Sequence, residues 1–214
     1  MELHPIKAVS FDMDGTLIDS EAISGEAVNF GYMEVLGREI SPEERLRLLG
    51  RPVKKILELW FPDVGADIYD TGRRYYESYF SSITAYDGVI ELLSRLRGAF
   101  RLAVVTSSHR SDAEKLLSLT GLKEFFDLYI AQEDSGRQKP DPEPLILAAQ
   151  KLGARPEETI MVGDQPYDII AAHSAGSKAV GALWGAGNLE SLMEYRPDYI
   201  IKKPGELLSI PDLL

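Results

Sequence analysis

The chain has 214 residues and a mass of 23.8 kDa, and its 44% hydrophobic and 27% charged residues exclude collagen-like, fibrous and disordered classes. The absence of cysteine excludes disulfide frameworks, cysteine–zinc sites and thiol catalysis. The net charge of −11 repels phosphate backbones, and no apolar run reaches the roughly 20 residues of a transmembrane helix. We therefore expect a soluble, cytoplasmic protein with no nucleic-acid and no membrane partner.

Short apolar runs without alternation predict strands that are covered on both faces of a sheet. Helical patterns separate these runs from about residue 90 onward, among them a capping-box pattern at Ser111 and Glu114 and a proline start at Pro166. This alternation favours an α/β fold with a doubly wound parallel sheet. The predicted strands cover residues 6–11, 102–106, 128–130, 159–162, 178–180 and 199–201.

A helical segment interrupts the alternation after the first predicted strand. It contains no strand pattern, and Ser41 with Glu44 forms a second capping-box pattern. We expect a core domain of residues 1–18 and 87–214 with an inserted α-helical domain of residues 19–86. The helices predicted in the insert cover residues 22–36, 44–49, 53–60 and 67–80.

Two carboxylates follow the first predicted strand. Asp12 and Asp14 lie at its end, and Gly15 permits a tight turn directly after them. Ligands bind outside the carboxyl ends of strands in open α/β sheets. Neighbouring anions repel each other unless a cation is near, and Mg²⁺ prefers oxygen ligands. The pattern indicates a magnesium site, and the alternative is an acidic turn that only reverses the chain.

A second pair of carboxylates, Asp164 and Asp168, follows the fourth predicted strand. Asp168 comes four residues after Asp164, which places both on the same side of the ensuing turn. Taken alone, Asp164 would be interpreted as a helix N-cap. Because two strand ends of one parallel sheet carry carboxylates, the sequence favours a cation pocket that both pairs share.

A lysine and several hydroxyl groups complete the candidate site. Lys139 lies in a proline-rich loop whose restricted backbone would aim its ammonium at both a carboxylate and a phosphoryl group. Thr106 and Ser107 follow the second predicted strand, where hydroxyl and backbone N–H groups suit phosphate oxygens. The alternatives are a solvated surface lysine and a helix N-cap at Ser107, Ser108 or Ser111.

These four segments, in this order, resemble the motifs of the haloacid dehalogenase-like superfamily of phosphohydrolases. The segments here are FDMDGTLIDS, LAVVTSS, QKPDPEPL and MVGDQPYDIIAA. The family pattern is a strand followed by DxDGT, a strand ending in Thr or Ser, a lysine often followed by proline, and GDxxxD. The resemblance extends over the whole chain, because the helical insert takes the position of the family's helical cap. It implies a Rossmann-like core with an inserted α-helical cap domain.

The resemblance implies a catalytic role for four residues. Asp12 would be the nucleophile that forms an aspartyl-phosphate, and Asp14 would be the general acid and then the general base. Thr106 would hold phosphoryl oxygens, and Lys139 would neutralise developing charge. The acid at Asp14 favours phosphate-ester chemistry, because similar dehalogenases and phosphonate-cleaving enzymes lack it.

The resemblance also implies Mg²⁺ as the cofactor. The ion would bind the Asp12 carboxylate, the Asp14 backbone carbonyl and Asp164, with Asp168 in the outer shell.

Substrate binding is assigned to Gly15, Thr16, Ser107 and Arg51. Gly15 and Thr16 would shape the loop after Asp14, and the Ser107 backbone would hold a phosphoryl oxygen. Arg51 stands in a loop of the insert that resembles the cap loop of similar enzymes, where it would meet an anionic group of the substrate. A basic helix start on the protein surface explains Arg51 equally well.

The substrate class has several alternatives. The carboxyl-terminal half resembles phosphoglycolate phosphatases first and inorganic pyrophosphatases second, and other segments resemble sugar-phosphate phosphatases and β-phosphoglucomutase. Phosphoglycolate phosphatases usually carry asparagine where Ser107 stands, which argues against phosphoglycolate itself. Non-enzymatic alternatives are a binding protein without turnover, against which the intact motifs argue, and an interaction module built on aromatic residues of the insert. We expect a small phosphorylated metabolite as the partner and a monomer or homodimer.

Overall fold

The computed structural model describes residues 5–48 and 51–213. Among these residues, no helix has both the length and the apolar composition that a membrane crossing requires.

The chain divides into two units. The core unit holds residues 5–19 and 84–213, and the helical unit holds Ser20–Ile83. The helical unit thus starts one residue later and ends three residues earlier than the expected insert (20 against 19, and 83 against 86). Ile18 forms an antiparallel bridge with Ala85, which ties the segment after the helical unit to the core.

The core unit is built on a six-stranded sheet in which every pair of neighbouring strands is parallel. The strand order is β3-β2-β1-β4-β5-β6, which confirms the doubly wound α/β fold. The first strand begins at Ala8 and not at residue 6. The strands are β1 (Ala8–Phe11), β2 (Arg101–Val105), β3 (Leu128–Ile130), β4 (Thr159–Gly163), β5 (Lys178–Ala182) and β6 (Tyr199–Ile201).

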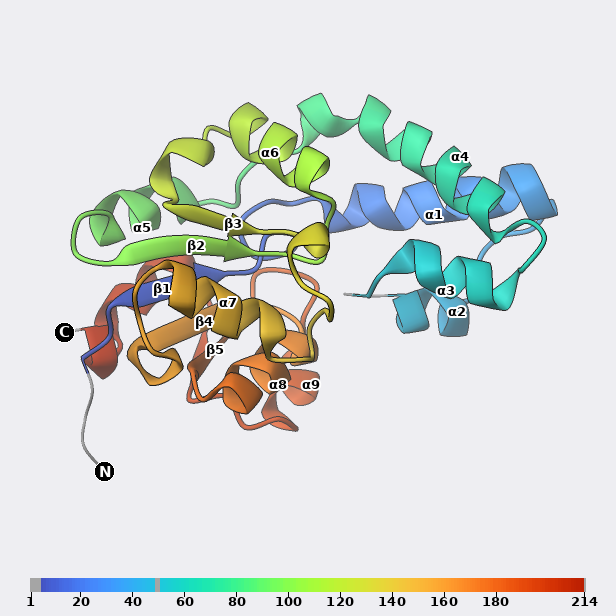
Figure 1. The fold of residues 1–214 in the computed structure, drawn as a ribbon. Helices are drawn as coiled ribbons and strands as arrows, with labels where there is room; N and C mark the ends of the chain where they lie inside the picture. Colours follow the sequence, from blue (N-terminus) through green and yellow to red (C-terminus); the bar gives the residue numbers. More distant parts are fainter. Residues whose placement is uncertain (1–4, 49–50, 214) are drawn as a thin grey trace. The chain divides into compact units, whose positions relative to one another are not determined.

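Helices cover both faces of this sheet. Figure 1 shows α5 and α6 on one face and α7 and α8 on the other. Every residue of β1 and β4 is buried, which explains why these strands are continuous apolar runs in the sequence. The core helices are α5 (Val89–Leu96), α6 (Arg110–Leu119), α7 (Glu143–Lys151), α8 (Pro166–Ala175) and α9 (Leu189–Met193), with short 3₁₀ turns at Lys123–Phe125, Gln132–Asp134, Pro156–Glu158, Pro204–Ser209 and Pro211–Leu213.

The order of the strands places the two acidic motifs beside each other. The chain goes from β1 outward to β2 and β3, and then returns to β4 on the other side of β1. The carboxyl ends of β1 and β4 therefore flank the topological switch point, where open α/β sheets bind their ligands. Asp12 directly follows β1, and Asp164 directly follows β4.

The helical unit consists of α1 (Glu21–Leu36), α2 (Pro42–Leu48), α3 (Val53–Trp60) and α4 (Gly65–Ser78), followed by a 3₁₀ turn at Phe80–Ser82. Glycines allow α1 and α4 to pack closely, because a Cβ at Gly72 would lie 2.6 Å from the Ala27 carbonyl oxygen. The described residues of this unit form no strand, as predicted. Trp60 and Phe61 pack against the buried core of the unit, which favours internal packing over the interaction module.

Several helix boundaries differ from the prediction. The capping box at Ser41 is confirmed, because the Ser41 amide donates to Glu44 Oε2 (2.9 Å) and the Glu44 amide donates to Ser41 Oγ (3.2 Å). The capping box at Ser111 is wrong, because α6 begins at Arg110 after the N-cap residue His109. The predicted helix 67–80 ends at residue 78 and gives way to the 3₁₀ turn. The predicted end of the second insert helix, residue 49, lies outside the described residues.

Candidate active site

Lys139 joins carboxylates that come from two different strand ends. Its Nζ donates to Asp12 Oδ1 (2.8 Å), to Asp168 Oδ1 (2.7 Å) and to the Val105 carbonyl oxygen (3.0 Å). An ammonium has three N–H donors, so these acceptors account for all of them. The Lys139 side chain is only 5% exposed. The lysine is thus a buried, fully bonded group and not a solvated loop residue.

Three buried carboxylates lie close together here, and two of them bond to this ammonium. Asp12, Asp164 and Asp168 each offer an oxygen within 4.8 Å of the others. Burial disfavours the charged form of Lys139. The negative charges of Asp12 and Asp168 together have the larger effect and hold the pKa of Lys139 above its ordinary value. Burial raises the pKa of Asp168 to about 7, and the negative charges of Asp12 and Asp164 raise this pKa as well. The positive charge of Lys139 lowers it, but by less than burial raises it. The excess of negative charge favours a second cation at this position.

The donor set of this cluster fits a magnesium ion, which prefers carboxylate and carbonyl oxygens. Asp164 is fully buried, and its carboxylate is oriented by the protein. Thr16 Oγ1 donates to Asp164 Oδ1 (3.0 Å), while Gln165 Nε2 (2.7 Å) and the Gly187 amide (3.2 Å) donate to Oδ2. Among the described residues, Oδ2 of Asp12 accepts no hydrogen bond. Asp12 and Asp164 therefore present oriented oxygens that can hold a divalent cation.

Asp168 has a different environment from the other two carboxylates. Its Oδ1 accepts from Lys139, and its Oδ2 accepts from the Gln165 amide (3.1 Å) at the start of α8. Both oxygens are therefore engaged by protein donors. Because Oδ1 of Asp168 already has a cationic partner in Lys139, whereas the donors to Asp164 named above are neutral, Asp168 suits a residue that orients Lys139 better than one that coordinates a metal directly.

The loop after β1 places Asp14 and Thr16 near the same strand ends. Gly15 adopts φ = 79°, a left-handed conformation that favours glycine, and its amide donates to the Ile18 carbonyl oxygen (3.0 Å). Thr16 is buried and reaches Asp164 as described above. Ser108 Oγ donates to Asp14 Oδ2 (2.7 Å), which links the loop after β1 to the loop after β2.

The loop after β2 presents the hydroxyl groups that the sequence indicated. Thr106 is buried, and its Oγ1 accepts from the Ser108 amide (3.0 Å), so its own hydroxyl proton remains to be donated. Ser107 Oγ is buried and has no hydrogen-bond partner among the described residues. Because a buried hydroxyl without a partner costs free energy, Ser107 is suited to an acceptor on a ligand.

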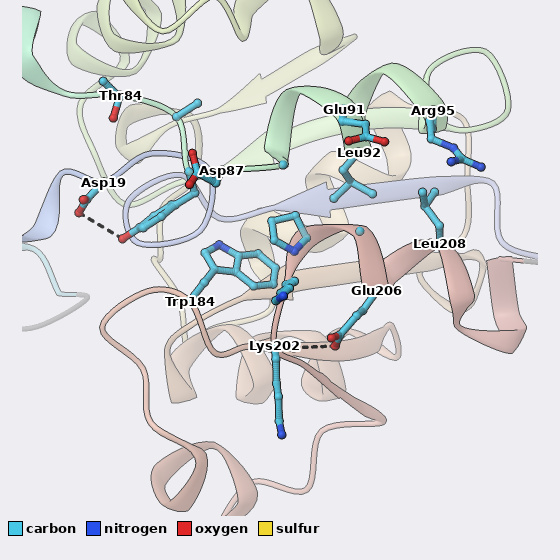
Figure 2. A pocket seen from close by; sticks show the side chains of 16 residues that line it. Asp19, Thr84, Asp87, Glu91, Leu92, Arg95, Trp184, Lys202, Glu206 and Leu208 are labelled. Atoms are coloured by element: carbon cyan, nitrogen blue, oxygen red, sulfur yellow. Dashed lines mark hydrogen bonds between the residues drawn. The ribbon is translucent and has the colours of Figure 1, made fainter.

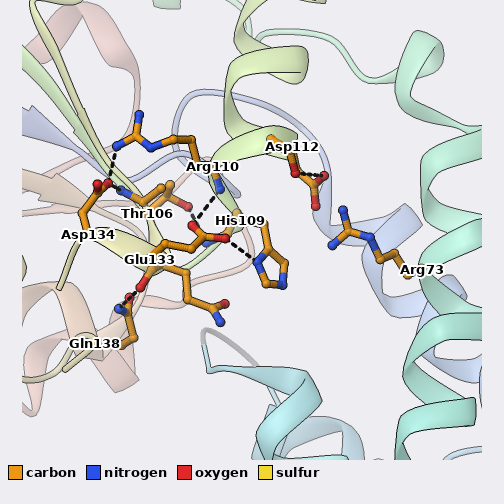
Figure 3. Close-up of polar contacts among 12 residues, drawn as sticks. Arg73, Thr106, His109, Arg110, Asp112, Glu133, Asp134 and Gln138 are labelled. Atoms are coloured by element: carbon orange, nitrogen blue, oxygen red, sulfur yellow. Dashed lines mark hydrogen bonds and ion pairs between the residues drawn. The ribbon is translucent and has the colours of Figure 1, made fainter. Parts of the chain in front are cut away.

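An ion pair and hydrogen bonds hold the loop after β2 to the loop after β3. Figure 3 shows His109 and Arg110 directed toward Glu133 and Asp134. His109 Nδ1 lies 2.6 Å from Glu133 Oε1, the Arg110 amide donates to Glu133 Oε2 (2.9 Å), and the Arg110 guanidinium pairs with Asp134. Glu133 thus satisfies a backbone donor at the start of α6, a role that the sequence had suggested for Ser111.

Several residues of this site were not identified from the sequence. Ser108 belongs to the segment after the second predicted strand, but the sequence does not predict its bond to Asp14. Gln165 stands beside Asp164 in the predicted motif and orients its carboxylate. Trp184 and Gly187 follow β5, and the signal that could have found them is the glycine-rich segment WGAG after a buried strand.

One predicted substrate residue lies outside this set of contacts. Arg51 is an exposed residue of the helical unit between α2 and α3, and the contacts given above do not include it. The other predicted residues, from the acidic loops to Lys139, belong to the core unit.

Comparison with known proteins shows the family. The profile of the haloacid dehalogenase-like hydrolases matches residues 9–182. The chain is 34% identical to pyrophosphatase PpaX of Bacillus pumilus over 207 residues, which cover 96% of each protein.

Two solved structures have the same fold over almost their whole length. A haloacid dehalogenase-like hydrolase from Streptococcus pneumoniae superimposes with a TM-score of 0.83 at 27% identity, covering 95% of this chain and 97% of the other. A Thermotoga maritima protein provisionally described as a β-phosphoglucomutase gives a TM-score of 0.76 at 26% identity, with the same coverage of 95% and 97%. The chain therefore belongs to the haloacid dehalogenase-like hydrolase family, and it is an enzyme of the phosphatase type.

Proposed function

We propose that the protein is a Mg²⁺-dependent phosphatase that works through a phosphoryl group covalently bound to Asp12. The observation that supports this most directly is the buried bond between Lys139 Nζ and Asp12 Oδ1 (2.8 Å). It holds the Asp12 carboxylate beside a buried cation, in a fixed orientation for attack on phosphorus. Phosphoryl transfer depends mainly on such positioning and on neutralisation of charge.

The first step forms a bond between an Asp12 oxygen and phosphorus and breaks the bond from phosphorus to the leaving oxygen. Asp14 donates its proton to that oxygen, and Ser108 holds the Asp14 carboxyl group in place (2.7 Å). In the second step a water oxygen attacks phosphorus, Asp14 accepts the water proton, and the Asp12–phosphate bond breaks. Thr106, Ser107 and Lys139 stabilise the charge on the phosphoryl oxygens during both steps.

Mg²⁺ would be held by the carboxylates of Asp12 and Asp164 and by the Asp14 backbone carbonyl, and it would reduce the charge on the phosphoryl group. Asp168 would keep Lys139 in position, because its Oδ1 already accepts a hydrogen bond from the Lys139 ammonium.

Inorganic pyrophosphate is the substrate that we propose first. The sequence favours phosphoglycolate first, but the similarity to pyrophosphatase PpaX, which covers 96% of each chain, supports placing pyrophosphate ahead of it. Serine at position 107, where phosphoglycolate phosphatases usually carry asparagine, agrees with the change. A sugar phosphate is the second candidate, because the fold is shared with a protein provisionally described as a β-phosphoglucomutase.

We propose that the helical unit, Ser20–Ile83, acts as the cap that selects the substrate, with Arg51 meeting an anionic group. Arg51→Ala should then raise KM for pyrophosphate more than KM for p-nitrophenyl phosphate, which has one anionic group fewer. Equal changes for both substrates would contradict this role. We also propose that the enzyme acts in the cytoplasm, which fractionation of the source cells would test.

The test of the proposed function is a rate measurement with pyrophosphate, phosphoglycolate, hexose phosphates and p-nitrophenyl phosphate, with Mg²⁺ and after its removal by EDTA. We expect turnover that needs Mg²⁺, that is highest in kcat/KM for pyrophosphate, and that Asp12→Asn abolishes. Asp87→Asn, at an exposed aspartate of the core unit, is the matched control and should keep wild-type rates. Turnover by Asp12→Asn at the wild-type rate, or full activity in EDTA, would refute the proposal.

A further inference from the structure

The loop that follows β5 lies against both acidic loops of the site. We refer to residues Trp184–Gly187 as the 184–187 loop. Trp184 Nε1 donates to the Thr16 carbonyl oxygen (2.9 Å), and the Gly187 amide donates to Asp164 Oδ2 (3.2 Å). One short segment therefore bonds to the loop after β1 and to the loop after β4, which are the two sources of the carboxylate cluster.

The 184–187 loop has no space for a side chain at either of its two glycines. A Cβ at Gly185 would clash with the Gly15 carbonyl oxygen and would lie 2.9 Å from Asp164 Cγ. A Cβ at Gly187 would clash with the Asp164 carbonyl oxygen and would lie 2.7 Å from its carbon. Both obstacles include backbone atoms of the site, so a larger side chain could fit only if the loops moved apart.

The Asp164 carboxylate depends on this packing for its orientation. The Gly187 amide and Gln165 Nε2 share its Oδ2, while Thr16 Oγ1 holds its Oδ1. Trp184 bonds to the same Thr16 residue through the Thr16 carbonyl group. A displacement of the 184–187 loop would therefore change the position of Asp164 and of the threonine that orients it.

Trp184 is a convenient site for substitution because its indole ring also faces a cavity. The ring is partly exposed and lines a cavity of about 880 Å³ that also includes Leu92 and Glu206 (Figure 2). Phenylalanine would keep an aromatic wall on this cavity and would remove only the N–H donor and part of the ring.

We propose that Trp184, Gly185 and Gly187 are positioning residues that set the affinity of the enzyme for Mg²⁺. This inference rests on the proposed function, since it assigns the loop a role at the metal site of that mechanism. The residues do not touch the ion or the substrate, and they act through Asp164 and Thr16. Groups that orient metal ligands typically change metal affinity by about 10–100-fold when they are replaced.

The test is a calorimetric titration of the substrate-free protein with MgCl₂, which requires no turnover. We expect Gly185→Ala and Gly187→Ala to weaken Mg²⁺ binding by about tenfold or more. Trp184→Phe should weaken it in the same direction but less, because it removes a bond to Thr16 and leaves the glycines in place. Gly205→Ala is the matched control, since a Cβ at Gly205 meets open space, and it should bind Mg²⁺ with wild-type affinity.

Two further measurements separate positioning from a general loss of structure. The melting temperature in EDTA should stay near the wild-type value for Trp184→Phe, and excess Mg²⁺ should restore kcat with pyrophosphate toward the wild-type value. Wild-type Mg²⁺ affinity in all three loop variants would overturn this inference and leave the proposed function intact. Loss of kcat that excess Mg²⁺ does not restore in Trp184→Phe would also overturn it. A wild-type protein that neither binds Mg²⁺ nor needs it for turnover would overturn both proposals.

Discussion

Replacement of Lys139 by methionine tests the electrostatic basis of the site. The change keeps most of the side-chain length and removes an ammonium that has three acceptors and is 5% exposed. Removing one partner of a buried ion pair costs about 3–5 kcal/mol, because the remaining charges stay buried without compensation. Here Asp12 and Asp168 would face each other, so we expect Lys139→Met to lower the free energy of unfolding by about that amount.

A surface lysine with the same kind of contacts provides the control. Lys178 Nζ lies 3.4 Å from Asp212 Oδ2 and 3.7 Å from Asp198 Oδ1, and its side chain is 36% exposed. Exposed ion pairs contribute about 0–1 kcal/mol, so Lys178→Met should have a small effect. Urea unfolding of both variants in EDTA, followed by circular dichroism, measures the difference. Equal destabilisation by the two changes would refute the reasoning. At saturating Mg²⁺, Lys139→Met should also lower kcat by about 10²–10³-fold, the loss seen when one donor to developing charge is removed.

Three further predictions concern the acid, its hydrogen-bond partner and a depressed pKa. Asp14→Asn should reduce kcat/KM strongly for alkyl phosphates and least for p-nitrophenyl phosphate, whose leaving group needs no proton, and an equal loss for all leaving groups would contradict the acid role. Ser108→Ala should lower kcat/KM for alkyl phosphates more than for p-nitrophenyl phosphate while KM changes little, because it releases the acid Asp14, and an equal loss for both substrates would count against this role of Ser108. Hydrogen bonds lower the pKa of Glu158 to about 2 from its ordinary value of 4.5. The largest contribution comes from the Arg155 amide, followed by Lys7 and the Arg155 guanidinium. The carboxylate therefore stabilises the fold above about pH 4.5 and less as pH falls toward 2, so the difference in unfolding free energy between wild type and Glu158→Gln should shrink over that range.

The sheet and the centre of the site could be predicted because the residues that define them follow buried strands directly. Asp12 and Asp164 are separated by most of the core sequence, yet each is the first residue after a fully buried strand. In a parallel sheet such positions lie at one edge, and the return of the chain from β3 to β4 makes their two strands neighbours. Lys139 required the family resemblance, because a lysine in a polar loop usually faces solvent.

The parts of the site that could not be predicted depend on contacts between segments that are distant in the chain. The bond from Ser108 to Asp14 spans 94 positions, and no local pattern marks it. The Ser111 capping pattern failed because Glu133, from the loop after β3, occupies the backbone donor at Arg110. Position 185 requires glycine because its loop packs against Gly15, a contact that the sequence does not indicate.

The central claim is that Asp12 forms a covalent bond to phosphorus, and the Asp14→Asn variant gives the most direct test of it. With p-nitrophenyl phosphate this variant should still be phosphorylated, whereas removal of the phosphoryl group should be slow because no base activates water. Acid quenching during turnover, followed by peptide mass spectrometry, should find one hydroxylamine-sensitive phosphoryl group on the peptide that contains Asp12. Release of p-nitrophenol with no phosphoryl group on the protein, or with the group on Ser107 or Ser108, would contradict the account.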